Sequence, residues 1–177
     1  MSLEDSEFEY FCSLLEENTF KKKEYLLQSG QLCNHHYFII ECLVRTFYFD
    51  DSGTEKIVQF GIENWWVTNM DSFIKQKPSS VNIQALEPTT TLSIRKDILD
   101  STYDKLPKIE RLFRIITENW LIAQQRNSHF YMKASSKDRY FGLIKSIPNF
   151  TQRVPQYMIA SYLDITPEYL SELRKTH

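Results

Sequence analysis

Long hydrophobic runs are absent from this sequence. No run approaches the roughly 20 apolar residues that a helix needs to span a bilayer. Residues 1–10 are acidic and contain no apolar signal-peptide core. We therefore expect a soluble, cytoplasmic protein with no membrane partner.

Cysteine and histidine are also scarce. The three cysteines, Cys12, Cys33 and Cys42, form an odd and scattered set, which predicts buried free thiols rather than a disulfide framework. The four histidines, at positions 35, 36, 129 and 177, include no His-x-His pair of the kind that holds a metal in β-roll enzymes. His35 and His36 fall at a predicted turn before a strand, so we expect both side chains to be exposed.

Sequence motifs of catalysis are missing as well. The sequence contains no glycine-rich phosphate loop, no nucleophile elbow and no Cys/His catalytic pairing. We predict that the protein is not an enzyme and that it needs no cofactor or metal.

The composition that is present favours a folded domain. Hydrophobic residues make up 42% of the chain and aromatic residues 14%, which is enough for a core and argues against intrinsic disorder. The net charge of −2 is unevenly distributed, because residues 133–177 hold 7 Lys/Arg against 4 Asp/Glu and the rest of the chain is acidic. A basic C-terminal end suits nucleic-acid contact, although a segment of this length reaches such a charge easily by chance.

Short strands are predicted between residues 20 and 98, after a short amphipathic helix within residues 3–17. The expected strands are rich in β-branched and aromatic residues and lie at 37–40, 43–49, 56–60, 81–85 and 91–94. Asp50-Asp51-Ser52-Gly53 separates two of them as a hairpin turn. Several short strands with no long helix between them predict an antiparallel barrel or roll.

A long helix is predicted over residues 106–133, which contain no glycine and carry their only proline, Pro107, in the first turn. Such a helix would be nearly 40 Å long at about 1.5 Å per residue, more than one small roll can cover. Part of its apolar face is therefore predicted to pack on a second copy, giving a homodimer; the alternative is packing on its own roll alone. The predicted dimerisation residues are Ile109, Leu112, Phe113, Ile116, Trp120 and Ala123.

Residues 153–177 have the pattern of a helix-turn-helix, in which two helices cross through a tight turn. Ala160 is the small residue at the crossing, and Asp164 stands where the turn needs a left-handed backbone. Thr166 is a helix N-cap followed by Pro167 as the first helical residue. The apolar residues that would fix the crossing are Ile159, Leu163, Ile165, Leu170 and Leu173. We predict helices at 156–163 and 167–175 that read DNA; the alternative is an ordinary αα-hairpin.

The second helix is expected to enter the major groove of double-stranded DNA with its N-terminus first. Thr166 and the backbone N–H groups of the first turn can hold a phosphate, and Glu168 can accept a hydrogen bond from a cytosine amino group. The residues predicted to contact DNA are Thr166, Pro167, Glu168, Tyr169, Ser171, Glu172, Lys175, Gln156, Arg153 and Arg139.

A β-roll, a long helix and a C-terminal helix-turn-helix, in this order, resemble the catabolite-activator/fumarate-nitrate regulator (Crp/Fnr) family of bacterial transcription regulators. The matching segments are 159–174, Leu43-Val44-Arg45 with Asp51-Ser52-Gly53-Thr54-Glu55, and Gln84-Ala85-Leu86-Glu87. The run Trp65-Trp66…Ser72-Phe73…Pro78-Ser79 resembles a branch common in Bacteroidetes-type bacteria. The resemblance implies an α+β fold: an antiparallel jelly-roll like the cyclic-nucleotide-binding domain over 1–105, a dimerisation helix over 106–133 and a DNA-binding domain over 134–177.

The residues that hold a cyclic nucleotide in that family are mostly replaced here. The family's Gly-Glu pair falls on Thr68-Asn69, and its Arg-Ser pair, whose arginine neutralises the cyclic phosphate, falls on Ser79-Ser80, so only Ser80 is retained. We predict that the roll does not bind cyclic AMP in the usual way. Its pocket, with Trp65 and Trp66 as further candidate residues, would take another small-molecule effector or none.

The recognition helix and the cysteines also depart from the family. Pro167 and Glu172 replace the flanking arginines, so an unusual DNA half-site is expected. Three cysteines are too few for a four-cysteine iron–sulfur cluster. Because Glu168 and Glu172 weaken attraction to phosphate, the competing interpretation is a degenerate β-roll/helix-turn-helix protein that acts as a protein-interaction adaptor.

Overall fold

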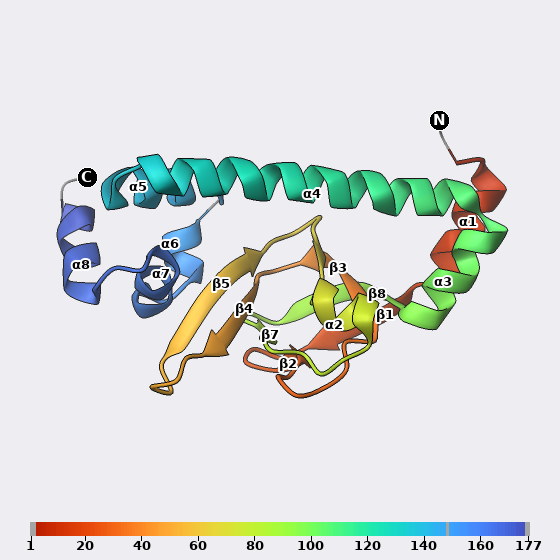
Figure 1. The fold of residues 1–177 in the computed structure, drawn as a ribbon, viewed down its shortest axis with the longest axis horizontal. Helices are drawn as coiled ribbons and strands as arrows, with labels where there is room; N and C mark the ends of the chain where they lie inside the picture. Colours follow the sequence, from red (N-terminus) through yellow and green to blue (C-terminus); the bar gives the residue numbers. More distant parts are fainter. Residues whose placement is uncertain (1–2, 148, 176–177) are drawn as a thin grey trace.

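The computed structural model describes residues 3–147 and 149–175. In these residues, two four-stranded sheets face each other, and all neighbouring strands within them are antiparallel. One sheet has the order β1 (Glu16–Phe20), β8 (Thr89–Arg95), β3 (His35–Glu41), β6 (Trp66–Val67), and the other has the order β2 (Tyr25–Leu27), β7 (Asn82–Ala85), β4 (Val44–Phe49), β5 (Glu55–Gly61). This is the antiparallel roll that the short-strand pattern predicts, and with the helices around it the α+β fold class is confirmed (Figure 1).

All five strands expected from the sequence are present, and Asp50-Asp51-Ser52-Gly53 turns the chain between β4 and β5. The Asp50 carboxylate accepts hydrogen bonds from the backbone N–H groups of Ser52 and Thr54, while Gly53 takes a φ of 78° that suits glycine. β1, β2 and β6 were not predicted. They are short or polar, and they exist because longer strands beside them supply the hydrogen bonds.

Helices close the roll at both of its ends. α1 (Asp5–Ser13) precedes β1, α2 (Met70–Lys75) follows β6, and α3 (Lys96–Lys105) follows β8. α4 (Pro107–Lys133) is the predicted long helix, with 27 residues and Pro107 in its first turn. It runs the length of the molecule in Figure 1, from α1 and α3 at one end to α5 at the other. In the described ranges, no helix is both long enough and apolar enough to cross a membrane.

The chain ends in a cluster of four helices: α5 (Ser136–Ser146), α6 (Phe150–Arg153), α7 (Gln156–Leu163) and α8 (Pro167–Lys175). Ser135 caps α5 by accepting a hydrogen bond from the backbone N–H of Asp138, whose carboxylate bonds back to Ser135. α7 and α8 have the predicted bounds. The helices α2, α3 and α6 were not predicted, because they are short or bury only one or two side chains each.

Two hydrophobic cores stabilise this arrangement. The first lies inside the roll and includes Ile39, Val44, Ile83 and Ile94, together with Ile109 and Phe113 from α4. The second core joins the roll to the terminal helices. Its roll side is Leu43, Phe47, Ile57, Phe60 and Leu86, and its helical side includes Phe150, Ile159, Leu163 and Leu170. The terminal helices therefore pack on the β4–β5 sheet rather than standing free of it.

Two expectations about scarce residues need correction. His35 and His36 belong to β3 instead of a turn, and His36 is buried while His35 is half-buried. Cys33 is buried as expected, but Cys12 is exposed and Cys42 is partly exposed, so only one of the three thiols is sealed in the core. In both cases the local sequence does not reveal which strand face or helix covers the side chain.

Candidate functional site

The turn between α7 and α8 has the geometry that the helix-turn-helix pattern predicts. Asp164 adopts a left-handed backbone, with φ 52° and ψ 49°. Thr166 caps α8, since its hydroxyl accepts a hydrogen bond from the backbone N–H of Tyr169 at 3.2 Å. Ala160 is buried at the crossing, and its carbonyl accepts a hydrogen bond from the N–H of Ile165 at 3.0 Å. Ile159, Leu163, Leu170 and Leu173 are buried and Ile165 is half-buried, as the apolar pattern predicts.

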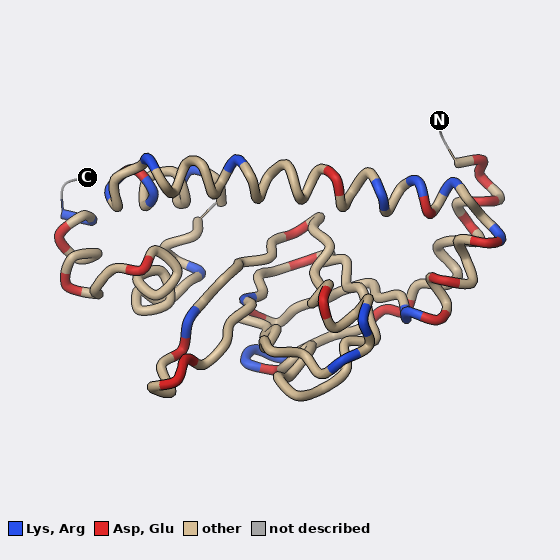
Figure 2. Tube along the Cα trace, in the orientation of Figure 1, with Lys and Arg blue, Asp and Glu red and all other residues tan. Residues whose placement is uncertain are grey.

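The outer surface of α8 brings together seven of the predicted DNA-contact residues. All seven are exposed: Thr166, Pro167, Glu168, Tyr169, Ser171, Glu172 and Lys175. Figure 2 shows acidic residues in the first and middle turns of this helix and Lys/Arg at its C-terminal end. The surface is therefore polar and accessible, with an acidic start and a basic end. Whether these residues contact DNA stays a prediction.

The other three predicted DNA contacts have different surroundings. Gln156 is exposed at the start of α7. Arg139 is half-buried, with its guanidinium 5.2 Å from the Tyr131 ring centre and its Nε donating to the Ala134 carbonyl. Arg153 lies between two carboxylates of the roll, and its guanidinium donates to Glu63 at 2.7 Å and to Glu87 at 2.8 Å.

The contact between Arg153 and the roll is one of several polar contacts that join the terminal helices to the roll. The pKa of the Arg153 guanidinium is raised, mainly by its hydrogen bonds to Glu87. Burial opposes this rise, and the hydrogen bonds to Glu63 add to it. Burial raises the pKa of Glu63, but the hydrogen bonds from Arg153 and from the backbone outweigh it and leave that pKa lowered. Nearby, the Ser161 hydroxyl donates to the Glu55 carbonyl at 3.0 Å and accepts from the Ile57 N–H at 3.2 Å. These bonds fix α7 on the β4–β5 hairpin.

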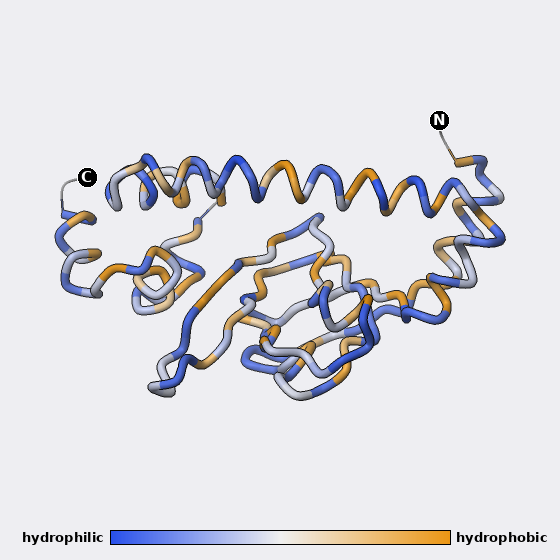
Figure 3. Tube along the Cα trace, in the orientation of Figure 1, coloured by the Kyte–Doolittle hydropathy of each residue, from blue (hydrophilic) through white to orange (hydrophobic). Residues whose placement is uncertain are grey.

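The predicted dimerisation face of α4 divides into two parts. Ile109 and Phe113 fill the core of their own roll, so the set that remains for a partner is Leu112, Ile116, Trp120 and Ala123. Leu121 and Ile122 add exposed apolar surface nearby, and Trp120 is 43% exposed. Figure 3 shows hydrophobic and hydrophilic segments that alternate along α4. Exposed apolar side chains gathered on one helix are typical of an interaction surface. Dimerisation through this face remains a proposal.

A cavity of about 500 Å³ lies between the roll and α4. Three of the predicted effector-pocket residues, Trp65, Trp66 and Thr68, line it. His36, which the sequence did not indicate as a site residue, lines the cavity from β3 and is 7% exposed. Burial lowers the pKa of His36 to about 4, so its ring is neutral at neutral pH. The one available signal was strand alternation, which puts His36 on the same face of β3 as Phe38.

The other three predicted effector residues do not line this cavity. Asn69 caps α2, its side-chain oxygen accepting from the Ser72 N–H at 2.8 Å. Ser79 is buried with its hydroxyl donating to the Val81 carbonyl, and Ser80 is exposed. The nearest lysines along the chain, Lys75 and Lys77, both form ion pairs with Asp71. The role of these three predicted residues stays a prediction.

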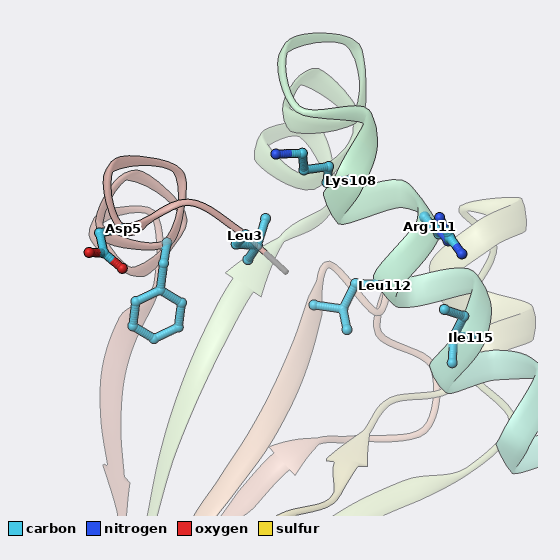
Figure 4. Close-up of a pocket in the computed structure, with 7 residues that line it drawn as sticks. Leu3, Asp5, Lys108, Arg111, Leu112 and Ile115 are labelled. Atoms are coloured by element: carbon cyan, nitrogen blue, oxygen red, sulfur yellow. The ribbon is translucent and has the colours of Figure 1, made fainter. Parts of the chain in front are cut away.

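A second cavity, of about 460 Å³, opens between α1 and the first turns of α4 (Figure 4). Leu3, Leu112 and Ile115 give it an apolar floor, and Asp5, Lys108 and Arg111 lie around it. The Lys108 ammonium forms an ion pair with Glu7 at 2.7 Å. This cavity continues the apolar face of α4 toward the start of the chain.

Comparison with known proteins places the chain among regulators. The family model for the cyclic nucleotide-binding domain matches residues 17–105. The regulatory protein HlyX of Actinobacillus pleuropneumoniae is 25% identical over 164 residues, which cover 86% of this chain and 68% of that protein. The anaerobic regulatory protein of Pasteurella multocida is 24% identical over 185 residues, covering 97% of this chain and 67% of that protein. The similar proteins are regulators and not enzymes, as the sequence predicted.

Solved structures share the fold of this chain. The structure of FixK2 from Bradyrhizobium japonicum superposes with a TM-score of 0.78 at 13% identity, covering 92% of this chain and 83% of that one. At this identity the likeness concerns the fold: a roll, a long helix and terminal helices in the same order. The Bacteroidetes-type branch and the division at residues 105 and 133 stay predictions.

Proposed function

Because the chain belongs to the Crp/Fnr family of transcription regulators and carries a cyclic nucleotide-binding domain, we propose that it acts as a homodimer that reads DNA through α8. Regulators of this family bind DNA as dimers. The observation that carries the proposal is the exposed surface of α8 on a largely buried helix-turn-helix core.

The N-terminal turn of α8 supports a role in positioning the protein on DNA. The Thr166 cap leaves the first backbone N–H groups of a nine-residue helix at an exposed end, where helix N-termini attract phosphate. Glu168 follows at the first turn, where it can accept from a cytosine amino group. Tyr169 is also exposed there and can contact base edges or backbone. We expect sequence reading to centre on Glu168.

The exposed apolar face of α4 supports the dimer. A second copy packed on Leu112, Ile116, Trp120 and Ala123 would remove the apolar surface of these residues from water. Each Å² buried would stabilise the dimer by about 25 cal/mol. Two copies of α8 related by a twofold axis would then read a palindromic site, with half-sites about one helical turn of DNA apart.

The roll is proposed to work without the usual control by cyclic AMP. Thr68-Asn69 and Ser79-Ser80 supply no charge to oppose a cyclic phosphate, and the Ser79 hydroxyl is already bonded to the Val81 carbonyl. An anion buried without a counter-charge is strongly disfavoured. Any effector of this roll would therefore be of another chemical class.

Binding to the DNA upstream of the protein's own gene, at two salt concentrations, tests the regulator proposal. We expect specific binding that weakens steeply with salt, because phosphate contacts release counterions. No specific binding, even at low salt, would refute the proposal and favour the protein-interaction adaptor.

A matched pair of variants tests how α8 reads DNA. Glu168→Ala and Glu172→Ala each remove one exposed acid from the same helix, so both should raise affinity for non-specific DNA by a similar factor. Only Glu168→Ala should change the preferred sequence in a selection from random DNA. An unchanged preference in Glu168→Ala would show that Glu168 does not read a base.

A further inference from the structure

The groove between α1 and the first turns of α4 leaves several apolar side chains in contact with water. Its cavity of about 460 Å³ is lined on the apolar side by Leu3, Phe8, Leu112 and Ile115. Phe8 is 57% exposed, and Leu112 and Ile115 are 37% and 39% exposed. Neighbouring exposed apolar side chains of this kind point to a surface that another molecule covers.

α1 is attached to α4 firmly enough to hold Phe8 in a defined place. The ring of Phe11 is buried and packs edge-to-face against Phe113 of α4, with 6.4 Å between the ring centres. The Lys108 ammonium donates to the Glu7 carboxylate at 2.7 Å. Both contacts lie within one turn of Phe8, so α1 cannot rotate Phe8 out of the solvent without breaking them.

Opposite charges stand on the two rims of this groove. Figure 4 shows Asp5 on the α1 side and Arg111 on the α4 side, with Leu3 and Leu112 between them. In a contact between two identical surfaces, a twofold rotation exchanges the two rims. Asp5 of one copy would then face Arg111 of the other, and the reverse pair would form at the same time. The groove is therefore complementary in charge to a second copy of itself.

The groove also continues the face of α4 that is proposed for the dimer. Leu112 belongs to both surfaces, and Ile115 follows it about one turn further along the helix. A twofold axis that runs along the paired α4 helices keeps equivalent residues at the same height. The first turns of α4 in one copy would thus lie beside α1 of the other copy.

We propose that α1 clamps the α4 helix of a second copy, with Phe8 packed on Leu112 and Ile115 and with Asp5 paired to Arg111 across the twofold axis. The inference rests on the proposed homodimer and adds to it a contact that α4 alone does not make. Each dimer would contain two such clamps. They would lie at the end of the long helices away from the helix-turn-helix (Figure 1).

A mixture of two charge-reversed variants tests the ion pair. In the homodimers, Asp5→Arg places two cations at each contact and Arg111→Asp places two carboxylates there. The heterodimer regains opposite charges at both contacts. We expect it to exceed the statistical mixture by roughly five- to tenfold, because each exposed ion pair contributes up to about a fivefold factor. Native mass spectrometry resolves the three dimers, since the two variants differ in mass.

This mixture also separates a contact between copies from one within a chain. If Asp5 and Arg111 met only inside their own chain, each variant would carry its like charges into the heterodimer unchanged. The statistical mixture would then result, and the clamp would be refuted.

A second pair of variants tests the apolar part of the clamp. Phe8→Ser removes the exposed ring from the groove, and we expect the dimer to dissociate at least about tenfold more readily in sedimentation experiments. Tyr10→Ser is the control, because Tyr10 is an exposed aromatic residue of the same helix that does not line the groove. Circular dichroism checks that both variants are folded.

Equal dissociation of Phe8→Ser and Tyr10→Ser would overturn the proposal and leave the groove to another kind of molecule. If the unaltered protein is a dimer that Trp120→Glu disrupts, such a result refutes the clamp and leaves the α4 dimer intact. A monomeric unaltered protein would refute the proposed homodimer and, with it, the clamp.

Discussion

Acid should destabilise this protein through His36 before most carboxylates are protonated. The ordinary pKa of 6.5 falls to about 4 in the folded state because the imidazole is buried. As the pH drops below 6.5, the unfolded chain takes up a proton that the folded protein does not accept until about pH 4. Stability is therefore lost across this window and not regained below it.

The size of the loss follows from the same shift. A displacement of about 2.5 pKa units, at about 1.36 kcal/mol for each unit, corresponds to about 3 kcal/mol between pH 7 and pH 4. His36→Phe should remove this part of the pH dependence. At pH 7 the variant should be as stable as the unaltered protein or more so, because it no longer buries an unpaired nitrogen.

Urea unfolding, followed by circular dichroism at several pH values between 4 and 7, measures the effect. The informative quantity is the difference between the two proteins, because His35, whose pKa is also lowered by burial, and the carboxylates titrate in both. The two free energies of unfolding should diverge as the pH falls from 7 to 4. Parallel curves would refute the assignment of the acid-sensitive step to His36.

Three further changes test other parts of the structure. Asp164→Gly should stabilise the fold by about 0.5–1 kcal/mol and Asp164→Ala should destabilise it by about 1 kcal/mol, because the turn needs a left-handed backbone. Thermal unfolding measures both changes. Equal melting temperatures of the two variants would contradict the turn geometry. Arg153→Met should lower the free energy of unfolding in urea by about 1–3 kcal/mol, because it leaves Glu87 and Glu63 without a cation. Arg95→Met, which removes an exposed ion pair, should lower it by less than about 1 kcal/mol. Similar losses in the two variants would show that the ion pairs of Arg153 add no particular stability. Trp120→Glu should shift the protein toward monomers in sedimentation experiments and Phe49→Glu should not; an unaltered dimer in Trp120→Glu would exclude this face of α4.

The elements that the sequence predicts well are those whose pattern is local. The bounds of α7 and α8 follow from a cap, a turn residue and an apolar spacing within a few residues of one another. The five longer strands and α4 follow from periodicity over a longer window. α3 could not be predicted because only Leu99 and Thr102 are buried in it, so its polar sequence shows little of the face that packs.

The site was less predictable because it depends on which distant elements meet. Arg153 is a basic residue beside the helix-turn-helix, and nothing near it in the sequence indicates Glu63 and Glu87 as partners. Similarly, His36 is buried because Trp66 of β6, Phe73 of α2 and Phe113 of α4 pack around its ring. Alternation could place His36 on a strand face, but it could not say what covers that face.

The core shared by the roll and the terminal helices limits how this regulator can be re-engineered. Phe60 of β5 packs edge-to-face against Phe150 and Tyr162, at 4.9 and 5.2 Å between ring centres. A chimaera that grafts another helix-turn-helix after α4 would leave Phe60 and Ile57 uncovered unless it also restored these aromatic contacts. If α8 reads DNA as proposed, new specificity is therefore better sought by changing its exposed residues than by exchanging all the terminal helices.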